Sequence, residues 1–127
     1  MKFPNFKRAL IVDNDEAFSR SLSKILQKAG YEVNAAVDVK QAIVLLFKEY
    51  YPLILLDLKM PGKSGLDLLR EITEKTPESK VIIVTAYGEL ASYREAMDAG
   101  AFSYLIKPVK RKEILENANR AWESLQK

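Results

Sequence analysis

The chain has 127 residues, of which 48% are hydrophobic and 29% are charged, and its formal net charge is +3. This is the composition of a single globular domain long enough to bury a core, and so mild a positive charge does not by itself indicate a nucleic-acid partner. The chain contains no cysteine and no histidine, which excludes disulfides, thiolate chemistry and histidine ligands, so any bound metal must be held by oxygen, as Mg²⁺, Ca²⁺ and Mn²⁺ are.

The first part of the chain predicts two strand–helix units. Residues 9–12 form an apolar run that ends in the acidic turn 13–16, and residues 31–37 alternate partly as in a second strand. The first helix is stopped by Gly30, and its apolar residues at helical spacing are Phe18, Leu22, Ile25, Leu26 and Ala29. Asp38 is a candidate N-cap for the second helix, which Pro52 closes and whose apolar side carries Ala42, Ile43, Leu46 and Phe47.

A third apolar run, residues 53–56, leads directly into Asp57. A short apolar run bounded by turn residues predicts a strand buried on both faces, and Pro61 and Gly62 indicate the loop that follows it. Ligands of open parallel sheets bind at the C-terminal ends of the strands. Asp57 is therefore the first candidate for a functional residue.

The second part of the chain continues the alternation. Ser64 is a candidate N-cap for a third helix, and residues 80–84 are a β-branched strand that ends at Thr85. A fourth helix runs from Glu89 to Ala99 and is stopped by Gly100, and a fifth strand runs from Phe102 to Ile106. The last helix runs from about Arg111 to Leu125. Inward positions of the third helix are Leu66, Leu69 and Ile72, and those of the last helix are Ile114, Ala118, Ala121, Trp122 and Leu125.

Strands that alternate with helices predict an α/β fold, a doubly wound five-stranded parallel sheet with helices on both faces. Short right-handed connections favour the flavodoxin-like strand order 2-1-3-4-5, whose switch point lies between the first and third strands. This order makes Asp13 and Asp57 neighbours. We expect one domain over residues 1–127, with a core at about residues 8–126.

Four polar residues follow different strands at the same predicted edge of the sheet: Asp13, Asp57, Thr85 and Lys107. Two carboxylates beside an acidic turn suit a hard cation, and a hydroxyl with an ammonium suits the oxygens of a phosphoryl group. An aspartate near a bound cation can itself attack phosphorus and form an acyl phosphate.

Five segments occur in the order and at the spacings of one known family: residues 11–16 (IVDNDE), 55–62 (LLDLKMPG), 84–87 (VTAY), 100–101 (GA) and 104–108 (YLIKP). From about Ala9 to Leu125 the chain resembles the receiver domains of two-component response regulators, including chemotaxis regulators. The resemblance implies a phosphorylation-dependent signalling switch in which Asp57 accepts a phosphoryl group from the phosphohistidine of a histidine kinase.

The resemblance also implies a Mg²⁺ site formed by Asp13, Asp57 and the backbone carbonyl of Lys59, with Lys107 bonded to the phosphoryl group. Asn14 stands where family members usually carry a second acidic residue. Its amide oxygen is able to ligate a hard cation but brings no charge, so we expect weaker metal binding. Whether Asn14 or the following Asp15 contacts the metal is left open.

Thr85 and Tyr104 are the switch pair that the resemblance implies, although strand alternation alone would also place an aromatic residue at position 104. The resemblance further implies a cis peptide bond between Lys107 and Pro108.

Lys59 and Tyr87 each lie two residues beyond a site residue, so both are expected to overhang the phosphoryl group and slow its hydrolysis. The chain would then catalyse its own phosphorylation and a slow self-dephosphorylation without being a conventional enzyme.

Two other function classes remain. Asp13, Asn14 and Asp15 superficially fit the first motif of the haloacid dehalogenase phosphatases, but the helix begins at once after Asp15 and Asp57 would have no role. The second is a receiver-like interaction module that does not take phosphate, and the substitution at Asn14 favours it.

The expected partners are a histidine kinase or phosphotransfer protein, and an output domain or downstream protein. The latter would bind the face made by the residues from Glu89 to Ala99, from Phe102 to Ile106 and from Arg111 to Leu125. The basic run 110–112 indicates a solvated helix start, so no direct nucleic-acid contact is expected. Homodimer formation on phosphorylation is left open.

No apolar run approaches the roughly 18 residues of a membrane span, and the start of the chain is too polar for a signal peptide. We therefore expect a cytoplasmic protein without a membrane partner. The chain ends after the last predicted helix, so no output domain is expected within it, and it is either a stand-alone regulator or part of a longer protein. Residues 85–88 resemble receivers attached to transcriptional activators, which hints at transcription regulation.

Overall fold

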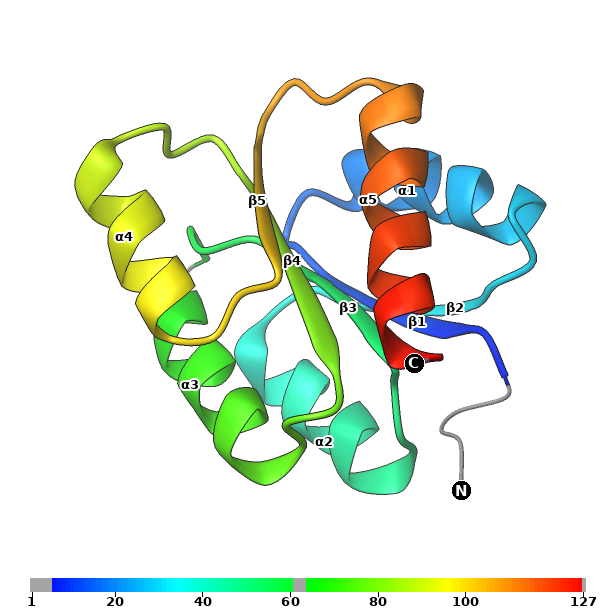
Figure 1. The fold of residues 1–127 in the computed structure, drawn as a ribbon, viewed down its shortest axis with the longest axis horizontal. Coiled ribbons are helices and arrows are strands. Elements are labelled where there is room, and N and C mark those ends of the chain that lie inside the picture. The colour runs from blue at the N-terminus through cyan, green and yellow to red at the C-terminus, as the bar shows by residue number, and fades with distance from the viewer. Residues whose placement is uncertain (1–5, 61–63, 127) are drawn as a thin grey trace.

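The computed structural model describes residues 6–60 and 64–126. The elements are β1 (Arg8–Val12), α1 (Glu16–Lys28), β2 (Glu32–Ala36), α2 (Val39–Lys48), β3 (Leu53–Leu56), α3 (Gly65–Lys75), β4 (Lys80–Thr85), α4 (Leu90–Asp98), β5 (Ser103–Ile106) and α5 (Arg111–Leu125). The paired strands are parallel, and their order β2-β1-β3-β4-β5 confirms the predicted fold (Figure 1). Pro61 and Gly62, predicted to open the loop after β3, lie outside the described residues.

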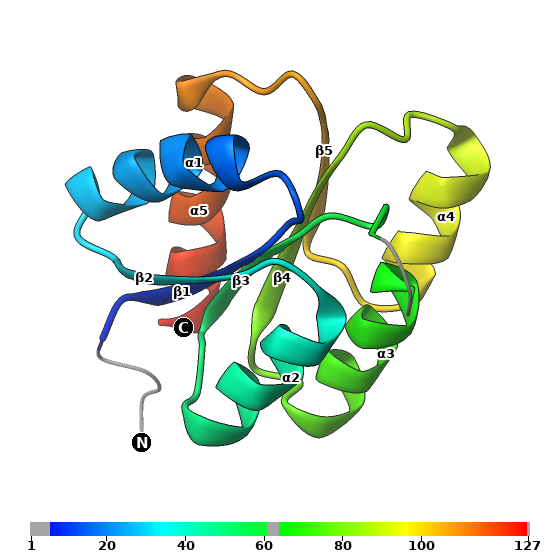
Figure 2. The same cartoon turned by 180° about the vertical axis from the view of Figure 1, so that it is seen from behind.

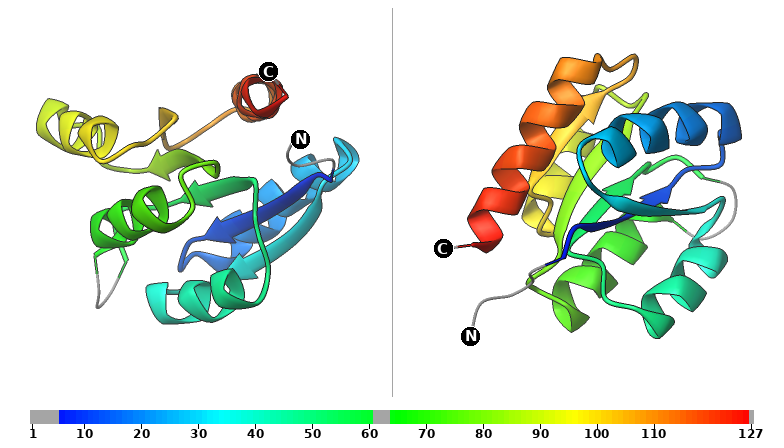
Figure 3. Two further views of the ribbon diagram at one scale, coloured as in Figure 1. Left: turned by 60° about the horizontal axis from the view of Figure 1, so that its bottom comes forward. Right: turned by 90° about the vertical axis from the view of Figure 1, so that its right-hand side faces the viewer.

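Helices cover both faces of the sheet. α1 and α5 lie on one side and α2, α3 and α4 on the other, as Figures 1 and 2 show from opposite directions. The right-hand view of Figure 3 shows the sheet between the two layers. In β1, Leu10 and Val12 belong to the apolar cluster beneath α2, α3 and α4, whereas Ala9 and Ile11 belong to the cluster beneath α1 and α5. Successive strand residues thus alternate between two buried faces, as an internal parallel strand requires.

The helix ends follow the predicted caps. Oδ1 of Asp38 accepts a hydrogen bond from the N–H of Gln41 at 2.8 Å, and Oγ of Ser64 accepts one from the N–H of Leu66 at 3.1 Å. These side chains satisfy backbone donors that have no partner within the helix. Gly30 follows α1 with a φ of +95°, a left-handed conformation that costs glycine little because it has no Cβ.

Some element ends differ from the prediction by one residue. β2 is Glu32–Ala36 rather than residues 31–37, and β5 begins at Ser103 rather than at Phe102. Glu89 and Ala99, predicted as helical, are the caps of α4. The backbone of Glu89 is extended, with ψ at 144°, because a capping residue stands half outside the helix it flanks.

Phe47 contradicts the prediction for α2. The sequence pattern places it on the apolar side of the helix, yet it is 93% exposed. The buried stripe of α2 contains Val39 and Ala42, with Leu46 partly buried beside them. Successive residues of an α-helix are about 100° apart, so Phe47 lies beyond the rim of this stripe. α2 carries more apolar residues than its contact face accommodates.

α5 buries Ile114, Ala118 and Ala121 as predicted, but Trp122 and Leu125 are only partly buried. The Trp122 ring packs edge-on against Tyr31, with ring centroids 6.4 Å apart. Its role is therefore one of packing. Among the helices of residues 6–60 and 64–126, none has both the length and the apolar character needed to cross a bilayer.

Candidate functional site

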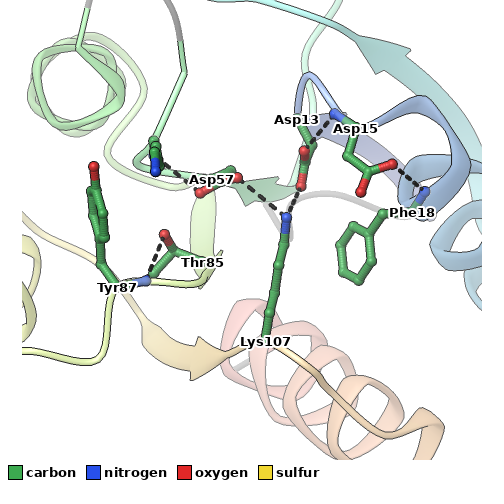
Figure 4. A network of polar contacts seen from close by, with 8 residues as sticks. Asp13, Asp15, Phe18, Asp57, Thr85, Tyr87 and Lys107 are labelled. Atoms are coloured by element: carbon green, nitrogen blue, oxygen red, sulfur yellow. Dashed lines mark hydrogen bonds and ion pairs between the residues drawn. The ribbon is translucent and has the colours of Figure 1, made fainter.

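The ends of several strands meet at one edge of the sheet, as predicted. The N–H of Asp13 donates to a carbonyl of β2 at 3.0 Å, and the N–H of Asp57 donates to the carbonyl of Val12 at 2.9 Å. Beyond β5, the N–H of Lys107 donates to the carbonyl of Thr85 at 2.8 Å. Backbone bonds therefore continue past the strand ends and fix the positions from which these side chains project. Figure 4 shows Asp13, Asp57 and Lys107 converging there.

Lys107 is shared by two carboxylates. Its Nζ lies 2.7 Å from Oδ2 of Asp13 and 3.2 Å from Oδ2 of Asp57 (Figure 4). The two aspartates are only 3% and 6% exposed, respectively, so both have lost most of their contact with water. Two carboxylates facing one ammonium leave negative charge in excess when all three groups are ionised, and that excess favours an additional cation.

The ionisation of this pair follows from burial and charge. Burial raises the pKa of Asp13, and the hydrogen bond from Lys107 offsets part of that rise. For Lys107, burial acts to lower the pKa, but the hydrogen bond to Asp13 and the charge of Asp57 outweigh it, so its pKa is raised. Lys107 therefore carries its charge at neutral pH.

The other oxygen of each carboxylate is held by the backbone. Oδ1 of Asp13 accepts a hydrogen bond from the N–H of Asp15 at 2.8 Å, and Oδ1 of Asp57 accepts one from the N–H of Lys59 at 3.0 Å. Each bond closes a turn between an aspartate and the residue two positions later. The two carboxylates are thus fixed from both sides, by a backbone N–H and by the ammonium.

Thr85 and Tyr104 flank the loop between β4 and α4. Thr85 is fully buried, and its Oγ1 accepts a hydrogen bond from the N–H of Tyr87 at 3.4 Å. The hydroxyl of Tyr104 donates to the carbonyl of Tyr87 at 2.6 Å, and its ring packs edge-on against Tyr93 at 5.4 Å between centroids. Tyr104 pairs in the sheet with Ile83, two residues before Thr85. Both switch candidates therefore point to the α4 side of the sheet.

Lys59 and Tyr87 lie together at the outer edge of the site. Nζ of Lys59 is 5.5 Å from the centroid of the Tyr87 ring, which is within the range of a cation–π contact. Both residues are at least partly exposed to solvent. Their contact joins the loop that follows Asp57 to the loop that follows Thr85.

The structure distinguishes Asn14 from Asp15. Oδ1 of Asp15 accepts a hydrogen bond from the N–H of Phe18 at 3.0 Å, which makes Asp15 the N-cap of α1. Asn14 is exposed beside the buried Asp13. Within residues 6–60 and 64–126, no three acidic, histidine or cysteine side chains gather in a group able to hold a metal ion. A cation at this edge would rest on two carboxylates and on neutral oxygens.

Two residues of the site were not predicted from the sequence. The ring centroid of Phe18 is 4.3 Å from Nζ of Lys107, whereas the sequence pattern places Phe18 only on the apolar face of a helix. Gly65 packs so closely that an added Cβ would lie 2.6 Å from the carbonyl oxygen of Asp57. No local pattern signals the first contact, because its partners are far apart in the sequence. The only signal for the second is a glycine directly after the helix cap Ser64.

The comparisons with known proteins agree with this geometry. The family model for the response regulator receiver domain matches residues 9–119. The chain is 38% identical over 116 residues to the chemotaxis protein CheY of Thermotoga maritima, covering 90% of this chain and 96% of that protein. It is 39% identical over 103 residues to the response regulator protein PilR of Pseudomonas aeruginosa, covering 81% of this chain but only 23% of PilR.

A solved structure extends the likeness to three dimensions. The beryllofluoride-activated NtrC4 receiver domain, determined as a dimer, superposes with a TM-score of 0.90 at 32% identity and covers 94% of this chain and 99% of that one. The cis peptide bond between Lys107 and Pro108, implied by the sequence resemblance, is also present. The chain belongs to the response regulator receiver domain family, and it is a phosphorylation-dependent switch of two-component signalling.

Proposed function

We propose that Asp57 is the phosphoryl acceptor of this switch, within a receiver core of about residues 8–126. The observation that carries the proposal is a buried carboxylate at the end of β3, held between the ammonium of Lys107 at 3.2 Å and the N–H of Lys59 at 3.0 Å. Asp13 also contacts Lys107, but it follows β1, where its N–H is bonded to β2. β3 lies between it and Thr85 at the end of β4, and both β3 and β4 lie between it and Tyr104 in β5. Asp57 is the carboxylate beside β4, which carries the switch candidate.

The reaction transfers a phosphoryl group between two proteins. A carboxylate oxygen of Asp57 attacks phosphorus of a phosphohistidine on the kinase or phosphotransfer protein. The new O–P bond forms as the P–N bond breaks, and the electron pair of that bond leaves with the imidazole. Lys107 bonds an oxygen of the transferred group, and the hydroxyl of Thr85 donates to another, so the negative charge of the group is matched by positioned donors.

Receiver domains generally bind Mg²⁺, and the residues of this site fit such an ion. Asp13 and Asp57 supply the charged oxygens, and Asn14 and the carbonyl of Lys59 would supply neutral ones. The ion would neutralise charge between the attacking carboxylate and the phosphoryl oxygens. Asp15 is not part of this set, since its carboxylate caps α1.

Asn14→Asp is expected to tighten Mg²⁺ binding. A third carboxylate adds one unit of charge near the ion, but desolvation and repulsion in the metal-free site offset most of the gain, which leaves about 1–2 kcal/mol. That is about a tenfold stronger affinity or somewhat more. Calorimetric titration with Mg²⁺ measures it, and Asn119→Asp, which adds the same charge on the exposed side of α5, is the matched control. Equal affinities for wild type and Asn14→Asp would show that position 14 is not a ligand.

Thr85→Ala is expected to accept phosphate but to respond less to it. The bond between the Thr85 hydroxyl and the N–H of Tyr87 is long at 3.4 Å, so a phosphoryl group is able to draw the hydroxyl away. Tyr104 holds the same loop through the Tyr87 carbonyl, which couples the movement to β5 and α4. Amide chemical shifts of residues 89–99 report the response. If phosphorylation changed these shifts as much in the variant as in wild type, the proposed coupling through Thr85 would be wrong.

Lys59→Ala and Tyr87→Ala are each expected to accelerate self-dephosphorylation. The two side chains contact each other at the edge of the site, where an in-line water must enter to hydrolyse the acyl phosphate. Loss of a contact worth about 0.5–1 kcal/mol corresponds to about two- to fivefold faster decay. The decay of phosphorylated protein after removal of the donor measures it. Unchanged decay in both variants would mean that the pair does not shield the phosphate.

The proposed output surface is the face made by α4, β5 and α5. Three exposed apolar side chains lie along it: Leu90, Tyr93 and Ile106. Tyr93 contacts Tyr104, so this face adjoins the switch pair, and it suits an output domain, a downstream protein or a second copy of the chain. The N–H of Lys110 donates to Oε1 of Glu113 at 3.0 Å at the start of α5, which accounts for the basic run as a helix start without a nucleic-acid contact. The expected compartment is the cytoplasm.

Acetyl phosphate with Mg²⁺ tests the proposed function. The wild-type chain should gain the mass of one phosphoryl group in an intact-mass measurement, and chelation of the metal should suppress the gain. An unlabelled wild type would favour a phosphate-independent interaction module. Turnover of small phosphate esters would favour a phosphatase of the haloacid dehalogenase type, although only residues 13–15 separate β1 from α1 and leave no room for an inserted hairpin.

A further inference from the structure

The ring of Phe18 lies against the proposed catalytic lysine. Nζ of Lys107 is 4.3 Å from the centroid of this ring, well within the roughly 6 Å over which a cation is attracted to an aromatic face. Figure 4 shows the ring beside the end of the lysine chain, on the side away from Thr85. The contact joins the first turn of α1 to the end of β5.

The ring is anchored through the backbone as well as by packing. The N–H of Phe18 donates to Oδ1 of Asp15 at 3.0 Å, and the N–H of Asp15 donates to Oδ1 of Asp13 at 2.8 Å. Asp13 in turn accepts a hydrogen bond from Lys107 at 2.7 Å. The four residues form a closed circuit of contacts, so the position of the ring is set by the same carboxylate that binds the lysine.

The other partners of Lys107 change during phosphoryl transfer. Asp57 becomes an acyl phosphate and Asp13 is a candidate metal ligand, so both carboxylates that hold the ammonium are drawn into other bonds. The Phe18 ring enters none of these bonds. A cation that rests on a fixed neutral face needs less reorganisation when it turns to a phosphoryl oxygen.

We propose that Phe18 is a positioning residue for phosphorylation, whose ring face holds the Lys107 ammonium at the site through a cation–π contact. The proposal rests on the proposed roles of Asp57 and Lys107. Phe18 also lines a groove between α1 and the loop after β5, together with Leu22 and Pro108. An aliphatic side chain of similar size would line that groove equally well but would offer no negative face to the lysine.

A series of variants at position 18 separates a cation–π role of Phe18 from a role in packing alone. Phe18→Leu should slow the labelling of Asp57 by acetyl phosphate about three- to tenfold, whereas Phe18→Tyr and Phe18→Trp should stay within about twofold of wild type. Phenylalanines with increasing numbers of ring fluorines keep nearly the same shape but weaken the negative face stepwise. Labelling rates should fall in step with fluorination, a trend that packing alone does not produce.

A second measurement reports the position of the Lys107 side chain independently of the phosphorylation rate. In protein labelled with ¹³C,¹⁵N-lysine, the ε-methylene protons of Lys107 should carry an upfield ring-current shift because they lie near the Phe18 ring. The shift should disappear in Phe18→Leu and return in Phe18→Tyr. Phe102→Leu is the matched control, because it removes a ring whose centroid is 5.8 Å from Nζ of Lys80 at the opposite edge of the sheet. It should label at the wild-type rate.

The outcomes distinguish this inference from the proposed function. If Asp57 is labelled equally fast in wild type, Phe18→Leu and the fluorinated series, Phe18 does not position Lys107, while the role of Asp57 stands. Lys107 signals that do not change in Phe18→Leu would overturn the inference in the same way. If wild type is not labelled at Asp57, the proposed function fails, and the ring-current shift still decides whether Phe18 holds the lysine.

Discussion

Asp57→Asn is expected to eliminate phosphorylation by acetyl phosphate, so that the mass gain of one phosphoryl group disappears. The amide has nearly the same shape as the carboxylate, and its oxygen is able to accept the N–H of Lys59 that now bonds Oδ1. It has no anionic oxygen with which to attack phosphorus. Lys107 keeps its shorter ion pair, to Asp13 at 2.7 Å, so the ammonium proposed to bond the phosphoryl group stays in the site.

The fold should survive this change. The substitution removes one of two carboxylates that share a single ammonium, and we expect the free energy of unfolding to change by about 1 kcal/mol or less. Asp67→Asn, which alters an exposed aspartate of α3 paired with Arg70, is the control and should be labelled like wild type. Labelling of Asp57→Asn at one specific other residue, located by peptide mass mapping, would show that Asp57 is not the acceptor.

The fold was predictable because its main signals are local. Leu10 and Ile11 are both buried although they point to opposite faces, so an internal parallel strand is a continuous apolar run visible in the sequence. The strand order then brings Asp13 and Asp57 together without any further information. Lys107 was predictable in the same way, since it directly follows the last strand.

The features that the sequence did not predict depend on contacts between distant parts of the chain. Phe47 and Leu46 are adjacent apolar residues of one helix, and only the width of the contact face decides which is buried. Asp15 resembles a metal ligand in the sequence but is used to cap α1. The contact of Phe18 with Lys107 joins helix α1 to the end of β5. Such assignments require the positions of neighbouring elements, which a periodic pattern does not contain.

Gly65 shows how closely the fold and the site are connected. It is the first residue of α3 and is buried against the backbone that follows β3. A Cβ at this position would lie 2.6 Å from the carbonyl oxygen of Asp57 and 2.9 Å from Cα of Leu58. These are backbone atoms, so relief requires α3 to move away or the Asp57 segment to shift, and no side-chain rotation suffices.

Gly65→Ala is therefore expected to destabilise the protein and to slow phosphorylation together. Overpacking against backbone should cost about 2–3 kcal/mol of the free energy of unfolding, which lowers the melting temperature by about 10 °C. A displaced Asp57 should be labelled at least about tenfold more slowly by acetyl phosphate, because small misplacements of reacting groups strongly reduce the reaction rate. Gly88→Ala is the matched control: its Cβ would lie 3.4 Å from the mobile end of the Ile106 side chain, so we expect a melting temperature within a few degrees of wild type. Thermal unfolding followed by circular dichroism and labelling rates followed by intact mass measure the two effects. A Gly65→Ala protein that melts and labels like wild type would mean that α3 does not approach Asp57 this closely.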